Sequence, residues 1–208
     1  MILAALALAA ASPAPQPLVL AFGDSLTAGY NLERGLGFAP QLQAALRRQG
    51  IAARVVDGGV SGDTTTAGAA RLGWTIDGLP RKPDLVILEL GANDMLRTID
   101  PAVPAANLEA MMGEFERRKI PVLVAGMKAA PNLGPAYRAK FDAIFANLAR
   151  KHHATLYPFF LEGVVGQPGM QQSDGLHPTF AGIKRIVTGI LPLVSTSLGH
   201  IEVQPVER

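Results

Sequence analysis

Apolar segments of two kinds alternate along this chain, and that alternation constrains the fold more than any other feature of the sequence. Short and nearly continuous apolar runs have the length of buried strands, whereas longer segments with apolar residues three or four positions apart are typical of amphipathic helices. The predicted strands are residues 18–23, 51–59, 83–91, 120–127 and 154–160. The predicted helices are residues 38–50, 63–76 with Asp63 as N-cap, 102–119, 134–152, and 179–194 with Pro192 near the end.

Five strand–helix pairs predict one parallel sheet with right-handed crossovers and helices on both faces. A closed barrel of this type needs eight such pairs, so we expect an open sheet. The fold class is therefore α/β, a three-layer α/β/α sandwich whose five-stranded parallel sheet has the flavodoxin-like order 2-1-3-4-5. The sequence has no internal repeat and no linker, so residues 17–198 are expected to form one domain, followed by a polar tail at 199–208.

Composition excludes several classes of function. Hydrophobic residues make up 49% of the chain and charged residues 17%, which is typical of a compact globular protein. The net charge is only +2, and the densest basic cluster, residues 117–119, lies where a predicted helix ends and cations complement the helix dipole. We therefore expect no nucleic-acid partner. The chain has no cysteine, which excludes disulfides, thiolate nucleophiles and cysteine-ligated zinc.

Residues 1–16 resemble a secretory signal. An apolar run too short for a membrane span leads to an A-x-A-like site at residues 9–11, and alternating prolines follow. No lysine or arginine precedes the run, and an ordinary first strand or helix is the alternative interpretation. We expect a periplasmic or secreted protein without a stable membrane span, and a cytoplasmic one if the run is not a signal.

Polar motifs follow four of the five predicted strands. Functional residues in an open parallel sheet gather outside the carboxyl ends of the strands. Strands 2 and 3 would flank strand 1, so the loops after these three strands should converge, and the loop after the fifth is long enough to reach back over them. The motifs are GDSL (23–26), GVSGDT (59–64), GAND (91–94) and DGLHP (174–178).

These loops hold the groups that acyl transfer requires. The Ser25 hydroxyl is a weak nucleophile until a base removes its proton, and His177 can be that base. Asp174 can accept a hydrogen bond from the second ring nitrogen of His177 and so fix the tautomer. The oxyanion formed on attack needs donors: the backbone N–H groups of Ser25 and Gly62 and the side-chain amide of Asn93.

The four motifs resemble the four blocks of the GDSL, or SGNH, hydrolase family, and the resemblance extends from about residue 18 to about residue 194. The most similar branch contains thioesterase I/lysophospholipase L1 and arylesterase-like enzymes. The resemblance implies Ser25 as nucleophile, Asp174 and His177 as the base system, and Gly62 and Asn93 as oxyanion donors, all on an α/β/α fold. The G-x-S-x-G elbow of α/β-hydrolases is absent, because Thr27 occupies the place of its second glycine.

Each motif alone has a structural interpretation. Ser25 could cap a helix, Asp174 and His177 could form a hydrogen-bonded turn, and Asn93 could be a turn residue. The SGDTTT loop could cradle a phosphate, although Asp63 would repel it. Asp24 is expected to fix its loop as a hydrogen-bond acceptor. It is the occurrence of all four motifs at one sheet edge that favours catalysis.

The sequence therefore predicts a serine esterase that acts on carboxylic esters and also on thioesters or lysophospholipids. Met95, Leu96, Met127 and Pro131 lie in loops at the same edge and are expected to line an acyl or aryl groove. The partner is a small ester or thioester, and neither a metal nor an organic cofactor is required. Two alternatives remain, a carbohydrate O-acetyl esterase with the same machinery and a non-catalytic flavodoxin-like binding module.

Overall fold

Five parallel strands form the centre of the computed structural model, which describes residues 16–199. The strands are β1 (Leu18–Gly23), β2 (Arg54–Gly59), β3 (Leu85–Glu89), β4 (Val122–Ala125) and β5 (Thr155–Tyr157). They pair in the order β2-β1-β3-β4-β5, which confirms the predicted order. The expected signal segment and polar tail lie outside the described residues, apart from Gln16 and Gly199.

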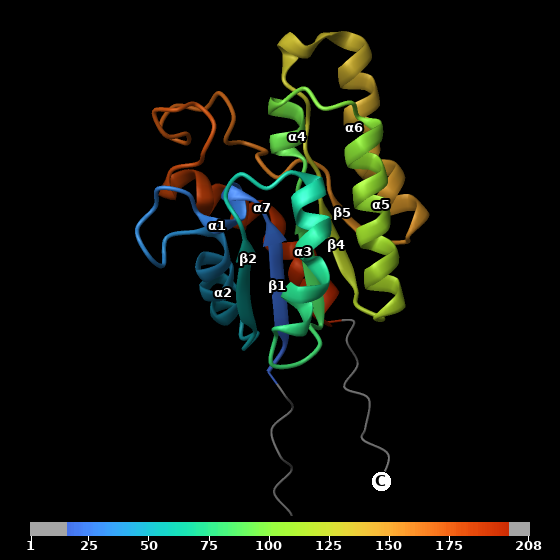
Figure 1. Cartoon of the computed structure of the whole chain (residues 1–208). Helices are drawn as coiled ribbons and strands as arrows, with labels where there is room; N and C mark the ends of the chain where they lie inside the picture. The colour runs from blue at the N-terminus through green and yellow to red at the C-terminus, as the bar shows by residue number, and fades with distance from the viewer. Residues whose placement is uncertain (1–15, 200–208) are drawn as a thin grey trace, which may run out of the picture.

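Helices cover both faces of the sheet and complete the three predicted layers (Figure 1). α2 packs against α7 behind the sheet, and α3 packs against α5 in front of it, with α6 beside α5. The long helices are α2 (Phe38–Arg48), α3 (Thr65–Asp77), α5 (Ala102–Arg117), α6 (Gly134–Lys151) and α7 (Phe180–Gly199). Three short ones, α1 (Ser25–Ala28), α4 (Ala92–Leu96) and the 3-10 turn η1 (Pro131–Leu133), were not predicted.

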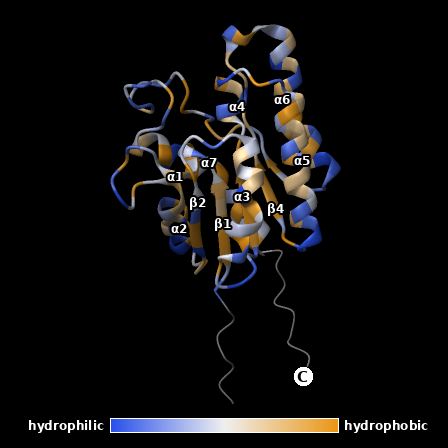
Figure 2. Ribbon diagram, in the orientation of Figure 1, coloured by the Kyte–Doolittle hydropathy of each residue, from blue (hydrophilic) through white to orange (hydrophobic). Residues whose placement is uncertain are grey.

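The central strands are buried on both faces. Every residue of β1 and of β3 is buried, which explains why both read as continuous apolar runs rather than as alternating ones. The strands β1 and β4 are coloured as hydrophobic, whereas the helices carry both hydrophobic and hydrophilic residues (Figure 2). Burying each large apolar side chain of this core stabilises the fold by about 1.5–3 kcal/mol.

Every predicted helix differs from the structure at one end or both, by one to five residues, and two of these differences have a clear physical cause. α3 begins at Thr65 and not at residue 63, because Thr64 is its N-cap and accepts a hydrogen bond from the Ala67 N–H at 3.3 Å. Asp63 instead accepts from Arg71 Nε at 2.6 Å. The last helix does not stop near residue 194 but continues to Gly199 with Pro192 inside it. Its apolar stripe continues in this extra turn, since Leu198 is buried.

The carboxyl ends of β1 and β2 meet very closely, and this contact positions α1. A Cβ atom on Gly59 would lie 2.8 Å from the backbone oxygen of Asp24, so only glycine lets the end of β2 approach the loop before α1. The first helical turn after β1 is thereby packed against the neighbouring strand.

Candidate active site

Ser25 is the first residue of α1 and directly follows the end of β1. The helix is capped by the preceding residue, because the Asp24 side chain accepts a hydrogen bond from the Leu26 N–H at 2.9 Å. The alternative role of Ser25 as a helix cap is therefore filled by Asp24, as is the loop-fixing role expected of that aspartate. The Ser25 hydroxyl is left to make other contacts, and the residue is 8% exposed.

The imidazole of His177 lies between Ser25 and Asp174. Its Nε2 is 2.9 Å from Ser25 Oγ, and its Nδ1 is 2.7 Å from Asp174 Oδ2. Asp174 Oδ1 also accepts hydrogen bonds from the backbone N–H groups of Leu176 and His177, at 2.9 and 3.0 Å. The His177 contact and these two amides lower the pKa of Asp174 to about 2. The carboxyl is therefore ionised at neutral pH and holds His177 Nδ1 as the protonated nitrogen.

The three amide groups predicted as oxyanion donors differ in their hydrogen bonding. Among the described residues, the backbone N–H groups of Ser25 and Gly62 have no protein acceptor. Gly62 has a φ of +88°, a conformation that favours glycine, in the turn that presents its N–H. The Asn93 side-chain nitrogen donates to the backbone oxygen of Asp63 at 2.9 Å and to Asp24 Oδ2 at 3.1 Å, so both of its hydrogens are engaged in this structure.

Two carboxyl groups are buried beneath Ser25. Burial raises the pKa of Asp24 to about 6, against the opposing effect of its hydrogen bonds from Leu26 and Asn93. Burial and the nearby charge of Asp24 also raise the pKa of Glu89 well above its usual value. Glu89 Oε2 accepts from the Thr27 hydroxyl at 2.8 Å, which ties the end of β3 to α1. We did not predict a role for Glu89, although a glutamate within an apolar strand was a signal.

Asp94 is a third buried acidic side chain, and it connects α3 with α4. Asp94 accepts hydrogen bonds from the Thr65 N–H at 2.8 Å and from the Thr65 hydroxyl at 2.7 Å. These bonds join the first turn of α3 to α4, which carries Asn93. Asp94 is completely buried, so the orientation of α4 depends on this pair.

A cavity of 480 Å³ opens beside Ser25 and His177. Met95, Leu96, Met127 and Pro131, the four residues predicted to line a groove, all contribute to its wall. The structure adds four apolar residues that the sequence analysis missed, from the loop after β5: Phe159, Leu161, Val165 and Leu176. The wall is mainly apolar, with Lys128, Arg138 and Asp142 as its charged residues.

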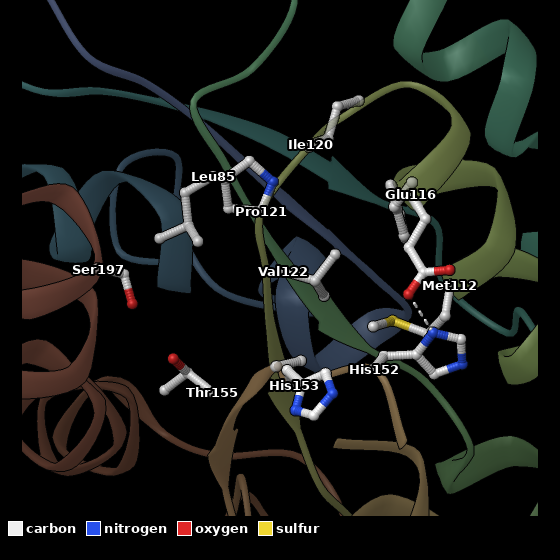
Figure 3. A pocket seen from close by; sticks show the side chains of 12 residues that line it. Leu85, Met112, Glu116, Ile120, Pro121, Val122, His152, His153, Thr155 and Ser197 are labelled. Atoms are coloured by element: carbon white, nitrogen blue, oxygen red, sulfur yellow. Dashed lines mark hydrogen bonds and ion pairs between the residues drawn. The ribbon is translucent and has the colours of Figure 1, made fainter. Parts of the chain in front are cut away.

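A second cavity, of 310 Å³, lies at the opposite, amino-terminal edge of the sheet (Figure 3). It is lined by residues at the starts of β3 and β4, Leu85 and Val122, and by the two histidines after α6. His152 Nδ1 lies 2.6 Å from Glu116 Oε1, which explains this histidine as part of an ion pair. None of the four motifs reaches this cavity.

A metal site and a membrane-spanning helix are two further kinds of functional feature to consider in the described part of the chain. Between residues 16 and 199, no cluster of three or more histidine or carboxylate side chains is arranged to hold a metal ion. Within the same range, no helix has both the length and the apolar character that a membrane crossing requires. Trp74 is 81% exposed on α3 and does not line the catalytic-edge cavity.

Comparisons with known proteins place this geometry in a family. Residues 21–185 match the GDSL-like Lipase/Acylhydrolase family. The chain is 38% identical to Esterase TesA of Pseudomonas aeruginosa over 180 residues, which cover 86% of this chain and 89% of that protein. It is 40% identical to an arylesterase of Vibrio mimicus over 171 residues, 82% of this chain and 84% of the relative.

Solved structures give the same result. AlinE4, described as an SGNH-hydrolase family esterase, is 46% identical, with a TM-score of 0.76 and coverage of 90% of this chain and 99% of that one. A crystal structure of TesA is 37% identical, with a TM-score of 0.81 and coverage of 86% and 99%. The alternative of a non-catalytic binding module is thereby excluded. The chain belongs to the GDSL-like lipase/acylhydrolase family, and it is a serine hydrolase of ester bonds.

Proposed function

We propose that Ser25 is the nucleophile of this esterase, with His177 as general base and Asp174 as the residue that orients it. Ser25 Oγ bonds to the ester carbonyl carbon as its proton passes to His177 Nε2, and the carbonyl π electrons move to the oxygen. Collapse of this tetrahedral species breaks the bond to the alcohol or thiol, which leaves with the proton from His177. The acyl group remains on Ser25.

The acyl-enzyme is then hydrolysed by the same groups. His177 takes a proton from a water molecule as the water oxygen attacks the acyl carbon. The second tetrahedral species releases the carboxylic acid and returns the proton to Ser25 Oγ. Asp174 remains ionised throughout and stabilises the imidazolium that forms in each half-reaction.

The backbone N–H groups of Ser25 and Gly62 and the Asn93 amide are the proposed oxyanion donors. The first two support this role because they have no protein acceptor among the described residues. We propose that the Asn93 N–H that bonds to Asp24 at 3.1 Å also donates to the developing oxyanion. The other N–H keeps its shorter bond to the backbone oxygen of Asp63. A donor in such a position is worth about 3–4 kcal/mol in the transition state.

The observation that carries this proposal is the 2.9 Å contact between Ser25 Oγ and His177 Nε2, across 152 residues of sequence. The test is a panel of p-nitrophenyl esters, acyl thioesters and lysophospholipids, assayed with wild type and Ser25→Ala. We expect covalent labelling of wild type by a fluorophosphonate probe and none of the variant. Hydrolysis that persists in Ser25→Ala would refute Ser25 as the nucleophile.

We further propose that the substrates have an apolar acyl or aryl part, which the cavity lined by Met95, Leu96, Met127 and Pro131 would hold. Each methylene buried there contributes about 0.8 kcal/mol, or about fourfold in kcat/KM. Met95→Asp should flatten the rise in kcat/KM from acetate to octanoate esters. Val103→Asp is the matched control, because Val103 is exposed on α5 and outside this cavity. An unchanged profile in Met95→Asp would contradict the assignment, and a strong preference for acetylated sugars would favour the O-acetyl esterase alternative.

The activities named for the relatives indicate which substrates to test first. One relative is an arylesterase, and another, from Escherichia coli, is named thioesterase 1/protease 1/lysophospholipase L1 and is 32% identical over 77% of this chain and 74% of its own length. We propose aryl and alkyl oxyesters as the principal substrates. An exported enzyme meets little acyl-CoA, so thioester hydrolysis would then be measurable without being the physiological reaction.

Export and domain organisation are part of the proposal. Residues 17–198 would form the hydrolase domain, residues 1–16 a signal that directs the protein to the periplasm or medium, and residues 199–208 a polar tail. The composition of the first 16 residues supports this assignment. N-terminal sequencing of the protein recovered from periplasmic and cytoplasmic fractions is the test, and an intact Met1 in the cytoplasm would contradict it.

A further inference from the structure

His177 is carried by a long loop that has no helix or strand of its own. Residues 158–179 connect β5 to α7 and form the loop drawn in orange beside the blue segment 29–37 (Figure 1). Its start is buried at Phe160 and Val164, whereas residues 173–176, next to His177, are exposed. The Asp174–His177 bonds are made within this loop, and so they orient the imidazole relative to the loop alone. Catalytic geometry requires the base to be held within about 0.5 Å of its working position. Other contacts must therefore fix the loop relative to Ser25.

The side-chain amide of Gln172 makes such contacts. Its Nε2 donates to the backbone oxygen of Tyr30 at 2.9 Å and to that of Pro178 at 3.0 Å. Its Oε1 accepts from Asn31 Nδ2 at 3.1 Å, and its backbone N–H donates to the His177 oxygen at 2.8 Å. One residue thus bonds to both sides of the histidine-bearing turn and to a segment more than 140 positions earlier in the chain.

That earlier segment is itself fixed to the nucleophile. The N–H groups of Gly29 and Tyr30 both donate to the backbone oxygen of Ser25, at 3.1 Å each. A continuous set of hydrogen bonds therefore runs from Ser25 through Tyr30 and Gln172 to His177, in parallel with the direct Ser25–His177 contact. Closing such a ring restricts the relative motion of the two catalytic groups.

The ring of Tyr30 adds a second contact to the imidazole. The two ring centroids are 4.4 Å apart, and the planes are tilted by 34°. The contact is made by the two rings themselves. A cation is attracted to an aromatic face at this distance, and His177 carries positive charge in the transition state.

We infer that Gln172 and Tyr30 are positioning residues for the Ser25–His177 pair. Gln172 holds the base loop against the segment after α1, and the Tyr30 ring supports the imidazole and favours its protonated form during turnover. The inference rests on the proposed function for its kinetic consequences, whereas the placement of the His177 ring by these two residues is independent of any activity.

The test compares Tyr30→Leu, Tyr30→Phe, Gln172→Met and the Tyr30→Leu/Gln172→Met double variant. On a soluble short-chain ester, we expect Tyr30→Leu and Gln172→Met each to lower kcat about five- to tenfold with KM nearly unchanged. Tyr30→Phe keeps the aromatic face and should stay within twofold of wild type. Because Gln172 fixes the backbone of Tyr30, the double variant should lose less than the product of the two single losses.

Nuclear magnetic resonance of the His177 ring protons gives a readout that needs no turnover. The aromatic ring of Tyr30 shifts these signals upfield, so Tyr30→Leu and Gln172→Met should move them downfield, and Tyr30→Phe should not. If Gln172→Met leaves both the ring signals and kcat as in wild type, the positioning role is refuted. If the ring signals respond as expected but wild type neither hydrolyses esters nor reacts with a fluorophosphonate, the placement stands and the proposed function fails.

Discussion

The two sides of the active site are built in opposite ways. The side that carries Ser25 and Asn93 rests on buried carboxyl groups, Asp24, Glu89 and Asp94, each bonded to a neighbouring element. The side that carries His177 is a surface loop, in which the His177 side chain is 18% exposed and that of Asp174 is 37% exposed. The start of this loop is anchored in the core by Phe160 and Val164, whereas the turn that carries Asp174 and His177 is held mainly by the polar bonds of Gln172 and the ring of Tyr30.

This difference separates stability from activity. The nucleophile side forms as part of the core, since its hydrogen bonds join β1, β3, α3 and α4, and so a substitution there changes both folding and catalysis. The turn with Asp174 and His177 adds little buried apolar surface, so we expect a substitution there to change catalysis far more than stability. Loops of low local stability on a rigid scaffold are a common arrangement at catalytic sites.

The largest expected effect is on the base side. His177→Ala should lower kcat by about 10⁶-fold, because no other group accepts the Ser25 proton. Asp174→Asn keeps the shape but favours the wrong tautomer and should lower kcat by about 10⁴-fold. The melting temperature of either variant should stay within a few degrees of wild type by circular dichroism. A large fall in the melting temperature would show that the turn with Asp174 and His177 also supports the fold. The two sides of the active site would then not differ in their effect on stability.

Asn93→Ala tests the buried side and should have a smaller kinetic effect with a measurable stability effect. We expect kcat to fall about 10²- to 10³-fold through loss of one oxyanion donor. The variant also loses bonds to Asp63 and Asp24, each worth about 0.5–3 kcal/mol, so the free energy of unfolding should fall as well. Urea denaturation and single-turnover kinetics measure the two effects, and a loss of activity without any loss of stability would make the two sides alike.

Sequence reasoning succeeded on the features that a local pattern encodes. β1 matches its prediction at both ends, because all its residues are buried and the apolar run is continuous. The strand order could be anticipated because five strand–helix units suit the flavodoxin-like order better than a barrel of eight. The proximity of Ser25 and His177 could be anticipated because each follows a strand end at the same edge, although 152 residues separate them.

Features that depend on contacts between distant residues were missed. The bonds of Asp94 to Thr65 and of Glu89 to Thr27 join residues 29 and 62 positions apart, and no pattern in the sequence specifies such pairs. The helices α1 and α4 are 4 and 5 residues long, too short to show a helical period. The start of α3 was misplaced because Asp63 and the adjacent threonines are all good N-caps, and only the Asp63–Arg71 ion pair decides between them.

Removing the buried carboxylate of Asp94 should have the largest effect on stability. Asp94→Ala loses two hydrogen bonds to a charged acceptor and leaves the Thr65 N–H buried without a partner, so the free energy of unfolding should fall by about 3–5 kcal/mol. Thr65→Val removes only the hydroxyl and should lose about half as much. Asp174→Ala is the control from the base side, with an expected change below about 1 kcal/mol. Equal losses in Asp94→Ala and Asp174→Ala, measured by urea denaturation, would contradict the comparison.

The contributions of the two sides to the free energy of unfolding should also change with pH in opposite directions. This is the smallest of the expected effects. The pKa of Asp24 is about 6 in the folded protein and 3.8 when unperturbed, so the folded state binds its proton more tightly between pH 4 and pH 6. Stability from this group therefore falls as pH rises through that window, by at most about 3 kcal/mol. Asp174 has a lowered pKa of about 2, so its contribution is present above pH 4 and is lost as pH falls toward 2.

Asp24→Asn isolates the effect of the buried side. The variant cannot titrate at this position, so the unfolding free energy of wild type minus that of the variant should decrease from pH 4 to pH 6 and stay level above it. The lost acceptor for Asn93 shifts this difference by a constant. The variant also removes the Asp24 charge that helps raise the pKa of Glu89, so the slope reports on the pair of buried carboxyl groups. Asp174 is at the surface, where solvent screens its interactions, so Asp174→Asn should give a nearly flat difference over the same range. Two flat differences would mean that burial does not distinguish the carboxyl beneath the nucleophile from the one beside the base.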